Sequence, residues 1–206
     1  ALAWDARGNP LFSGGGDGTL RIWRNEPLRL LRKIQVSDLP VRKSSLNPKS
    51  SELALVQSDG NSRHVLSVLD WETSKRKFSV DLPEVPLVLE FSPLGSFVVA
   101  SKTDWKSLTF FDPDDGGRLS YLQDGFGIVS FLMVSSSENT LVSYTPSSGT
   151  FIYWDLKPGR QKQTVRSVPE LKNLTAYNTR YAAGTLGSEF VVVDIVTGAV
   201  TASSKV

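Results

Sequence analysis

The sequence predicts an all-β fold made of repeated groups of four short strands. Candidate strand ends recur 39–48 residues apart, a spacing typical of four-stranded repeats, at Trp23, Trp71, Phe111, Trp154 and Val193. Prolines lie between the candidate strands, where a missing N–H costs no ladder hydrogen bond. No stretch shows a sustained apolar period of 3.6 residues, so we expect helix to be a minor component at most.

The stretch 13–23, which reads SGGGDGTLRIW, shows the pattern most clearly. A short strand enters a glycine-rich turn, and a second strand then places Leu20 and Ile22 on one face and Trp23 on the other. The glycines can adopt the positive φ that a tight hairpin needs, and Asp17 can accept hydrogen bonds from the amides of the turn. The stretch therefore predicts a β-hairpin.

In chain order, the pattern predicts five segments of four strands within one domain, residues 1–206. The segments cover residues 1–34, 42–82, 86–122, 129–166 and 171–203. The first segment opens with a strand that carries Trp4, which we expect to be buried. The second and third segments repeat the order strand, turn, strand, and the fifth is placed mainly by its spacing.

The stretch 13–23 and the Asp-Ile-Val-Thr-Gly turn at 194–198 resemble WD40 repeats. The resemblance implies a WD40-type β-propeller with about five four-stranded blades, part of a larger ring of seven blades or so. It also implies a set of structural repeat positions: Ser13, Asp17, Trp23, Asp59, Trp71, Trp154 and Asp155. The only histidine, His64, lies away from the place where the family carries one, so the family's side-chain hydrogen-bond network is expected to be incomplete.

Composition restricts the classes of function. The formal net charge is +2, which gives no whole-molecule argument for binding nucleic acid or membrane. There is no cysteine, which excludes disulfides and thiol catalysis and fits an intracellular protein, cytoplasmic or nuclear. No apolar run approaches the ~20 residues of a membrane-spanning helix. Because residue 1 is Ala and already reads as strand, we expect the chain to be a piece of a longer protein.

Side chains suited to catalysis are scarce. With one histidine and no cysteine, neither a Ser-His-Asp triad nor a Cys-His pair is convincing. The acidic turn 112–116 lacks the closing Glu of a calcium loop, and the glycines at 14–18 lack the Lys-Ser/Thr of a phosphate loop. We therefore expect no enzyme activity, no metal, no cofactor and no small-molecule substrate.

A candidate binding face arises when charges are sorted by loop. In WD40 proteins, the turns between second and third strands and the connections between blades emerge on one face, which commonly binds partners. By this resemblance the face would carry Trp105 surrounded by Lys102, Lys106, Arg63, His64, Arg42 and Lys43. A Trp among basic side chains suits an acidic or phosphorylated peptide, or RNA. Alternatively, Trp105 folds onto its own loop and the lysines are merely solvated.

Two functions follow from these patterns. The first is a non-catalytic WD40 protein-interaction scaffold within a multi-protein assembly. The alternative is a nucleic-acid-binding component of a ribonucleoprotein complex, acting through the basic face of blades two and three. A strong salt dependence of binding would favour the alternative, because phosphate contacts release counterions.

Overall fold

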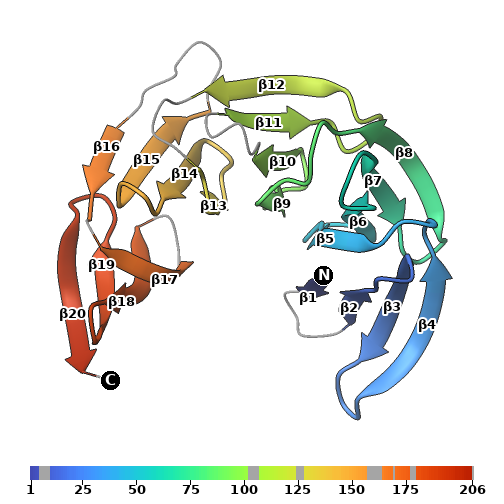
Figure 1. Ribbon diagram of the computed structural model, residues 1–206, viewed down its shortest axis with the longest axis horizontal. Helices are drawn as coiled ribbons and strands as arrows, with labels where there is room; N and C mark the ends of the chain where they lie inside the picture. Colours follow the sequence, from blue (N-terminus) through green and yellow to red (C-terminus); the bar gives the residue numbers. More distant parts are fainter. Residues whose placement is uncertain are drawn as a thin grey trace. The chain divides into compact units, whose positions relative to one another are not determined.

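The computed structural model describes residues 1–4, 10–101, 107–123, 128–156, 164–168, 170–176 and 180–205 (Figure 1). All regular elements in these ranges are β-strands, so the predicted all-β fold is confirmed. The chain forms two compact units, residues 1–103 with 107–122, and residues 104–106 with 123–206. The described part of the chain contains no helix with the length and apolar character needed to cross a bilayer.

The first unit contains three four-stranded antiparallel sheets, each a simple meander in chain order. The first sheet consists of β1 (Leu2–Trp4), β2 (Leu11–Gly14), β3 (Thr19–Arg24) and β4 (Arg29–Gln35). The second consists of β5 (Val41–Leu46), β6 (Glu52–Ser58), β7 (His64–Asp70) and β8 (Lys75–Asp81). The third consists of β9 (Leu89–Phe91), β10 (Val98–Ser101), β11 (Ser107–Phe111) and β12 (Arg118–Gln123).

The second unit contains two sheets of the same kind. One consists of β13 (Phe131–Val134), β14 (Thr140–Thr145), β15 (Thr150–Asp155) and β16 (Thr164–Ser167). The other consists of β17 (Leu171–Ala176), β18 (Tyr181–Leu186), β19 (Glu189–Asp194) and β20 (Ala199–Lys205). Their facing side chains form one core, in which Tyr144 and Phe151 contact each other and the Tyr144 hydroxyl donates a 2.6 Å hydrogen bond to the Leu171 carbonyl.

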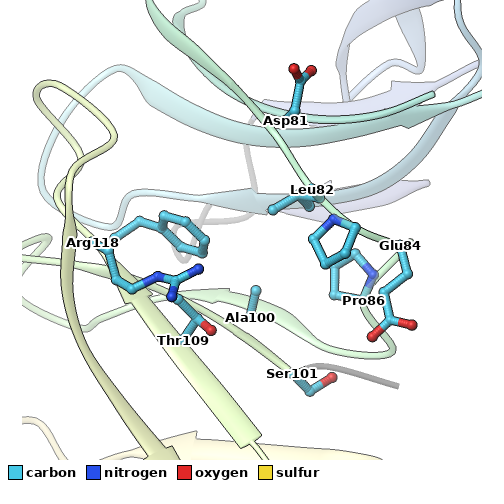
Figure 2. A pocket seen from close by; sticks show the side chains of 10 residues that line it. Asp81, Leu82, Glu84, Pro86, Ala100, Ser101, Thr109 and Arg118 are labelled. Atoms are coloured by element: carbon cyan, nitrogen blue, oxygen red, sulfur yellow. The ribbon is translucent and has the colours of Figure 1, made fainter. Parts of the chain in front are cut away.

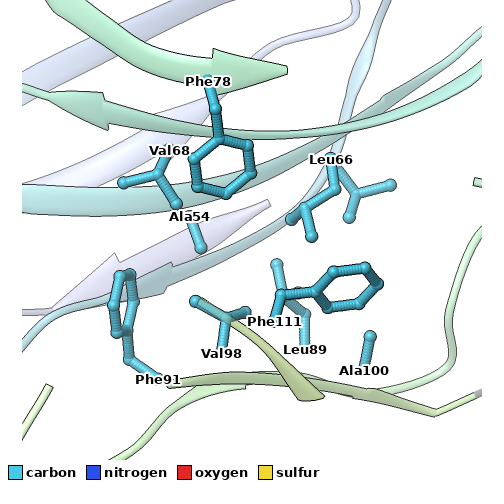
Figure 3. Close-up of a cluster of buried hydrophobic side chains, with 10 residues drawn as sticks. Ala54, Leu66, Val68, Phe78, Leu89, Phe91, Val98, Ala100 and Phe111 are labelled. Atoms are coloured by element: carbon cyan, nitrogen blue, oxygen red, sulfur yellow. The ribbon is translucent and has the colours of Figure 1, made fainter. Parts of the chain in front are cut away.

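Alternation along the strands explains how the sheets of the first unit pack. Leu20 and Ile22 on β3 are buried against the second sheet, as their alternation predicts, whereas Trp23 on the other face is half-buried. The second and third sheets enclose a further core that includes Phe78, Phe91 and Phe111 (Figure 3). The prediction for Trp4 is wrong: its side chain is 52% exposed, because it lies on the face of the first sheet that points away from the core between the first and second sheets.

A β-bulge recurs where the third strand of a sheet meets the fourth. The register shifts between Ile22 and Trp23, between Val68 and Leu69, and between Val192 and Val193. In each case the third residue of the fourth strand is the extra one: Leu31, Lys77 and Thr201. Because a bulge increases the local twist, its repetition gives the outer edges of these sheets a similar twist.

Candidate interaction face

Three chain segments meet at one end of the first unit, which we call the connection end. They are the connection 36–40 between the first two sheets, the β6–β7 turn, and the connection 82–88 between the second and third sheets. Backbone hydrogen bonds join them to the strands: Ser58 N to Pro40 O (2.9 Å), Leu82 N to His64 O (2.7 Å) and Ser101 N to Val88 O (3.1 Å). Residues far apart in the sequence are thereby brought to one surface.

Arg42 and Arg63 of the predicted basic face lie beside the β6–β7 turn. The Arg42 Nε donates a 3.2 Å hydrogen bond to the Ser58 carbonyl, and Arg63 forms a 3.1 Å ion pair with Asp38. The Asp59 carboxylate accepts hydrogen bonds from the backbone amides of residues 61–63, which hold its pKa below the ordinary value. The two arginines are therefore fixed at a rigid turn that also carries negative charge.

His64 lies inside the protein and not on the predicted surface. Its side chain is 9% exposed, and its Nδ1 lies 2.7 Å from the Ser58 hydroxyl oxygen. The same oxygen accepts a 2.8 Å hydrogen bond from the Gly60 amide, so the Ser58 hydroxyl links the imidazole ring to the turn. We infer from this arrangement that His64 stabilises the β6–β7 turn.

Lys43 on β5 faces a carboxylate on the next sheet. Desolvation raises the pKa of Glu90 on β9. A 3.3 Å hydrogen bond donated by the Ser45 hydroxyl and the positive charge of Lys43 both lower this pKa, but their effect is smaller. The charge of Lys43 is thus partly offset. Trp105, Lys102 and Lys106, the centre of the predicted face, lie outside the described residues.

Two of the predicted repeat tryptophans make the same cross-strand contact. The Trp23 indole donates a 2.8 Å hydrogen bond to the Ser13 hydroxyl, and the Trp154 indole donates a 3.0 Å hydrogen bond to Ser143. Trp71 is half-buried against the core between the first two sheets, and its ring meets Phe12 edge to face at 5.2 Å. Asp155 ends β15.

The predicted turn residue Asp17 sits in a small hydrogen-bond network. Its carboxylate accepts a 2.6 Å hydrogen bond from the Thr19 hydroxyl and a 2.7 Å hydrogen bond from Arg21. Both contacts lower the pKa of Asp17, with the Arg21 contact the larger cause. Of the four glycines at 14–18, only Gly18 has positive φ. Gly14 is required for a different reason, because a Cβ there would lie 2.4 Å from the side chain of Val41.

A pocket opens at the connection end, between the second and third sheets (Figure 2). Its empty volume is about 390 Å³, open mouth included. Its lining combines apolar and polar residues: Asp81, Leu82, Pro83, Glu84, Pro86, Ala100, Ser101, Thr109, Phe111 and Arg118. Sequence reasoning missed this site because its residues come from β8, a connection and three other strands, and no local motif links them.

The described residues offer no cluster of three or more His, Asp or Glu side chains that could hold a metal ion. The expected absence of metal, cofactor and catalysis stays a prediction.

Comparison with known proteins gives two findings. A family model described as an N-terminal beta-propeller domain matches residues 4–205. An uncharacterized protein of Treponema pallidum (strain Nichols) is 24% identical over 199 residues, which are 95% of this chain and 32% of the relative. The chain therefore spans about a third of the length of the curated relative that it matches.

Proposed function

Since this chain belongs to a family of N-terminal β-propeller domains, we propose that it is a non-catalytic interaction scaffold that binds other proteins of a multi-protein assembly. The β-propeller predicted from the sequence is confirmed by the family match. The WD40 type, the number of blades and the ring that they complete remain part of the proposal. The Trp–Ser hydrogen bonds in two of the sheets support the WD40 type.

The observation that carries the proposal is the composition of the connection end. Exposed cations at Arg42 and Arg63 lie there together with a pocket, on sheets whose buried strands hold them in place. Loops positioned by a rigid scaffold are where binding residues concentrate. A surface that combines charged side chains with an apolar hollow has the mixed chemistry of a protein-binding site.

A protein partner fits this end better than a nucleic acid. Of the cations described at this end, Arg63 is paired with Asp38 and Lys43 faces Glu90, which leaves Arg42 and the pocket residue Arg118 without an ion pair among the described residues. A surface for the phosphate backbone needs many cations free to contact phosphates and displace the counterions of the nucleic acid. Nucleic-acid binding is therefore kept as an outcome of the test.

Affinity capture from a native extract tests the proposal. The bait carries Arg42→Glu and Lys43→Glu, which reverse the charge at the connection end. The matched control is Lys75→Glu, an exposed cation at the far end of the β7–β8 hairpin. Each capture is run with and without nuclease, and bound proteins are quantified by mass spectrometry.

We expect a set of proteins that resists nuclease, is lost with the double variant and is retained with the control. Loss of the set on nuclease treatment would favour a nucleic-acid partner instead. Equal capture by the double variant and by the wild-type chain would show that the connection end is not the binding face.

A further inference from the structure

We propose that the pocket at the connection end binds a carboxylate group of a partner protein, with Arg118 and Thr109 as its ligands. This inference rests on the proposed interaction function and specifies the chemistry that the face recognises. The carboxylate belongs either to an acidic side chain or to a chain terminus.

The first argument is an uncompensated charge. Among the described residues, no ion pair or hydrogen bond engages Arg118, which begins β12 and is exposed. Figure 2 shows its guanidinium group beside Thr109, directed across the pocket. A guanidinium presents several N–H donors in a fixed plane that matches a carboxylate, and such charge-assisted hydrogen bonds are stronger than neutral ones.

The second argument is an unpaired hydroxyl group on a largely buried residue that lines the pocket. Thr109 is 4% exposed and lines the pocket, and no hydrogen bond within the described ranges involves its hydroxyl. The hydroxyl of Ser101, which is 2% exposed, accepts a 2.9 Å hydrogen bond from the Val88 amide and keeps its own hydrogen. Hydroxyl donors that line the same pocket as a guanidinium therefore favour an acceptor with several lone pairs.

The floor of the pocket keeps the Thr109 and Ser101 hydroxyl groups in place. Ala100 and Phe111 belong to the core between the second and third sheets (Figure 3). Leu82 packs against that core. Fixed donors lose little conformational freedom when a ligand binds. The enclosed part of the pocket has a volume of only about 50 Å³, so it can admit a small group such as the end of one side chain or of a chain.

The two carboxylates in the lining do not neutralise Arg118. Asp81 and Glu84 lie away from the guanidinium in Figure 2, and Glu84 makes an interaction of its own. They make the pocket asymmetric, so we expect the ligand carboxylate at the Arg118 side and a less acidic part of the partner at the other side.

Amide NMR of the 206-residue chain tests the proposal with blocked tripeptides. The probes are acetyl-Gly-Glu-Gly-amide, its Gln and Lys counterparts, and acetyl-Gly-Gly-Gly with a free carboxylate. We expect the Glu peptide or the free carboxylate to shift the amide signals of Ser101 and Thr109. Which of the two binds identifies the source of the carboxylate.

Variants test the roles of the two residues. Arg118→Gln should weaken binding about ten-fold or more, and Thr109→Val should weaken it less, because one is a charged and the other a neutral donor. Arg29→Gln, an exposed cation on β4, is the matched control and should leave the affinity unchanged. Equal shifts with the Gln peptide, preference for the Lys peptide, or unchanged binding by Arg118→Gln would each overturn the proposal.

Protein capture separates this proposal from the proposed function. If Arg118→Gln captures the wild-type set of proteins while the Arg42→Glu/Lys43→Glu bait loses it, the carboxylate pocket is wrong and the scaffold function stands. If neither bait loses a partner, both fail.

Discussion

The indole N–H groups of the repeat tryptophans show how one residue decides whether a buried polar atom is satisfied. Ser13 pairs with Arg21 across the sheet, and Ser143 pairs with Ile152. Arg21 and Ile152 each come two residues before the Trp of their own strand. In the second sheet Leu53 takes this position, opposite Leu69. The buried Trp71 Nε1 consequently has no hydrogen-bond partner among the described residues.

This difference predicts that two identical substitutions have unequal effects. Trp154→Phe removes a hydrogen bond and leaves the fully buried Ser143 hydroxyl unpaired, whereas Trp71→Phe removes an N–H that is already unpaired. We expect Trp154→Phe to cost about 1–2 kcal/mol more in unfolding free energy than Trp71→Phe. Urea denaturation of both variants measures the difference, and equal losses would contradict the explanation.

Gly18 is the glycine of the first hairpin that backbone geometry requires. Its φ is +69°, and a Cβ there would lie 2.1 Å from the Ser37 carbonyl oxygen. We expect Gly18→Ala to destabilise the protein by more than about 1–2 kcal/mol, through left-handed strain together with this clash. Gly16→Ala is the matched control, because a Cβ at Gly16 meets nothing within 4 Å. Thermal or urea unfolding would contradict this account if both variants lost the same stability.

At the scale of the element, three hairpins share one turn. In each, an Asp side chain accepts a hydrogen bond from a backbone amide two or three residues later, and the residue four positions after the Asp has positive φ. The pairs are Asp70 with Ser74, Asp112 with Gly116, and Asp194 with Gly198. Only the β7–β8 turn places a residue with a Cβ in the left-handed conformation.

Ser74→Gly should therefore stabilise the protein. A non-glycine residue in the left-handed region costs about 1–2 kcal/mol, and the greater freedom of glycine in the unfolded chain offsets part of the gain. We expect a net increase in unfolding free energy of about 0.5–1 kcal/mol. The reverse change, Gly116→Ser, should destabilise, because a Cβ there would also lie 2.5 Å from the ring of Phe78. A urea midpoint that falls for Ser74→Gly would show that Ser74 contributes more than backbone conformation.

The sequence predicted the elements that depend on local patterns and missed those that depend on distant partners. Alternation placed β3 at Thr19–Arg24 and β15 at Thr150–Asp155, within the predicted segments. The bulge at Leu31 leaves no local signal, because only the register with β3 defines it. The pocket is lined by residues as far apart in the sequence as Asp81 and Arg118, so no local pattern marks it. Trp4 was misplaced because alternation shows that a strand has two faces but does not show which face is covered.

At the scale of the molecule, the aspartates bound to turns and arginines tie stability to pH. The pKa values of Asp17, Asp38, Asp59 and Asp70 are held below the ordinary value of 3.8, mainly by hydrogen bonds to each carboxylate. Desolvation alone would raise the pKa of Asp194. Hydrogen bonds from the Thr197 and Val196 amides and from the Arg180 side chain outweigh it, so the pKa of Asp194 is lowered as well. Glu90 is opposite in direction, because desolvation raises its pKa.

These shifts predict that acid weakens the fold. As the pH falls, the unfolded chain takes up protons near the ordinary pKa of 3.8, before the folded aspartates do. The stability that the five aspartates contribute is therefore present above about pH 4–5 and is lost as the pH falls through their lowered folded values. Glu90 acts in the opposite direction, because the stability that it contributes is lost as the pH rises through its raised folded pKa. It is one group against five, so the aspartates dominate.

Urea midpoints at pH 7, 5, 4 and 3 should be similar at the first two values and then decline. Asp70→Asn, whose amide oxygen can still accept the Thr73 hydrogen bond, should decline less steeply. A midpoint that rises between pH 5 and pH 3 would show that raised carboxyl pKa values dominate the fold.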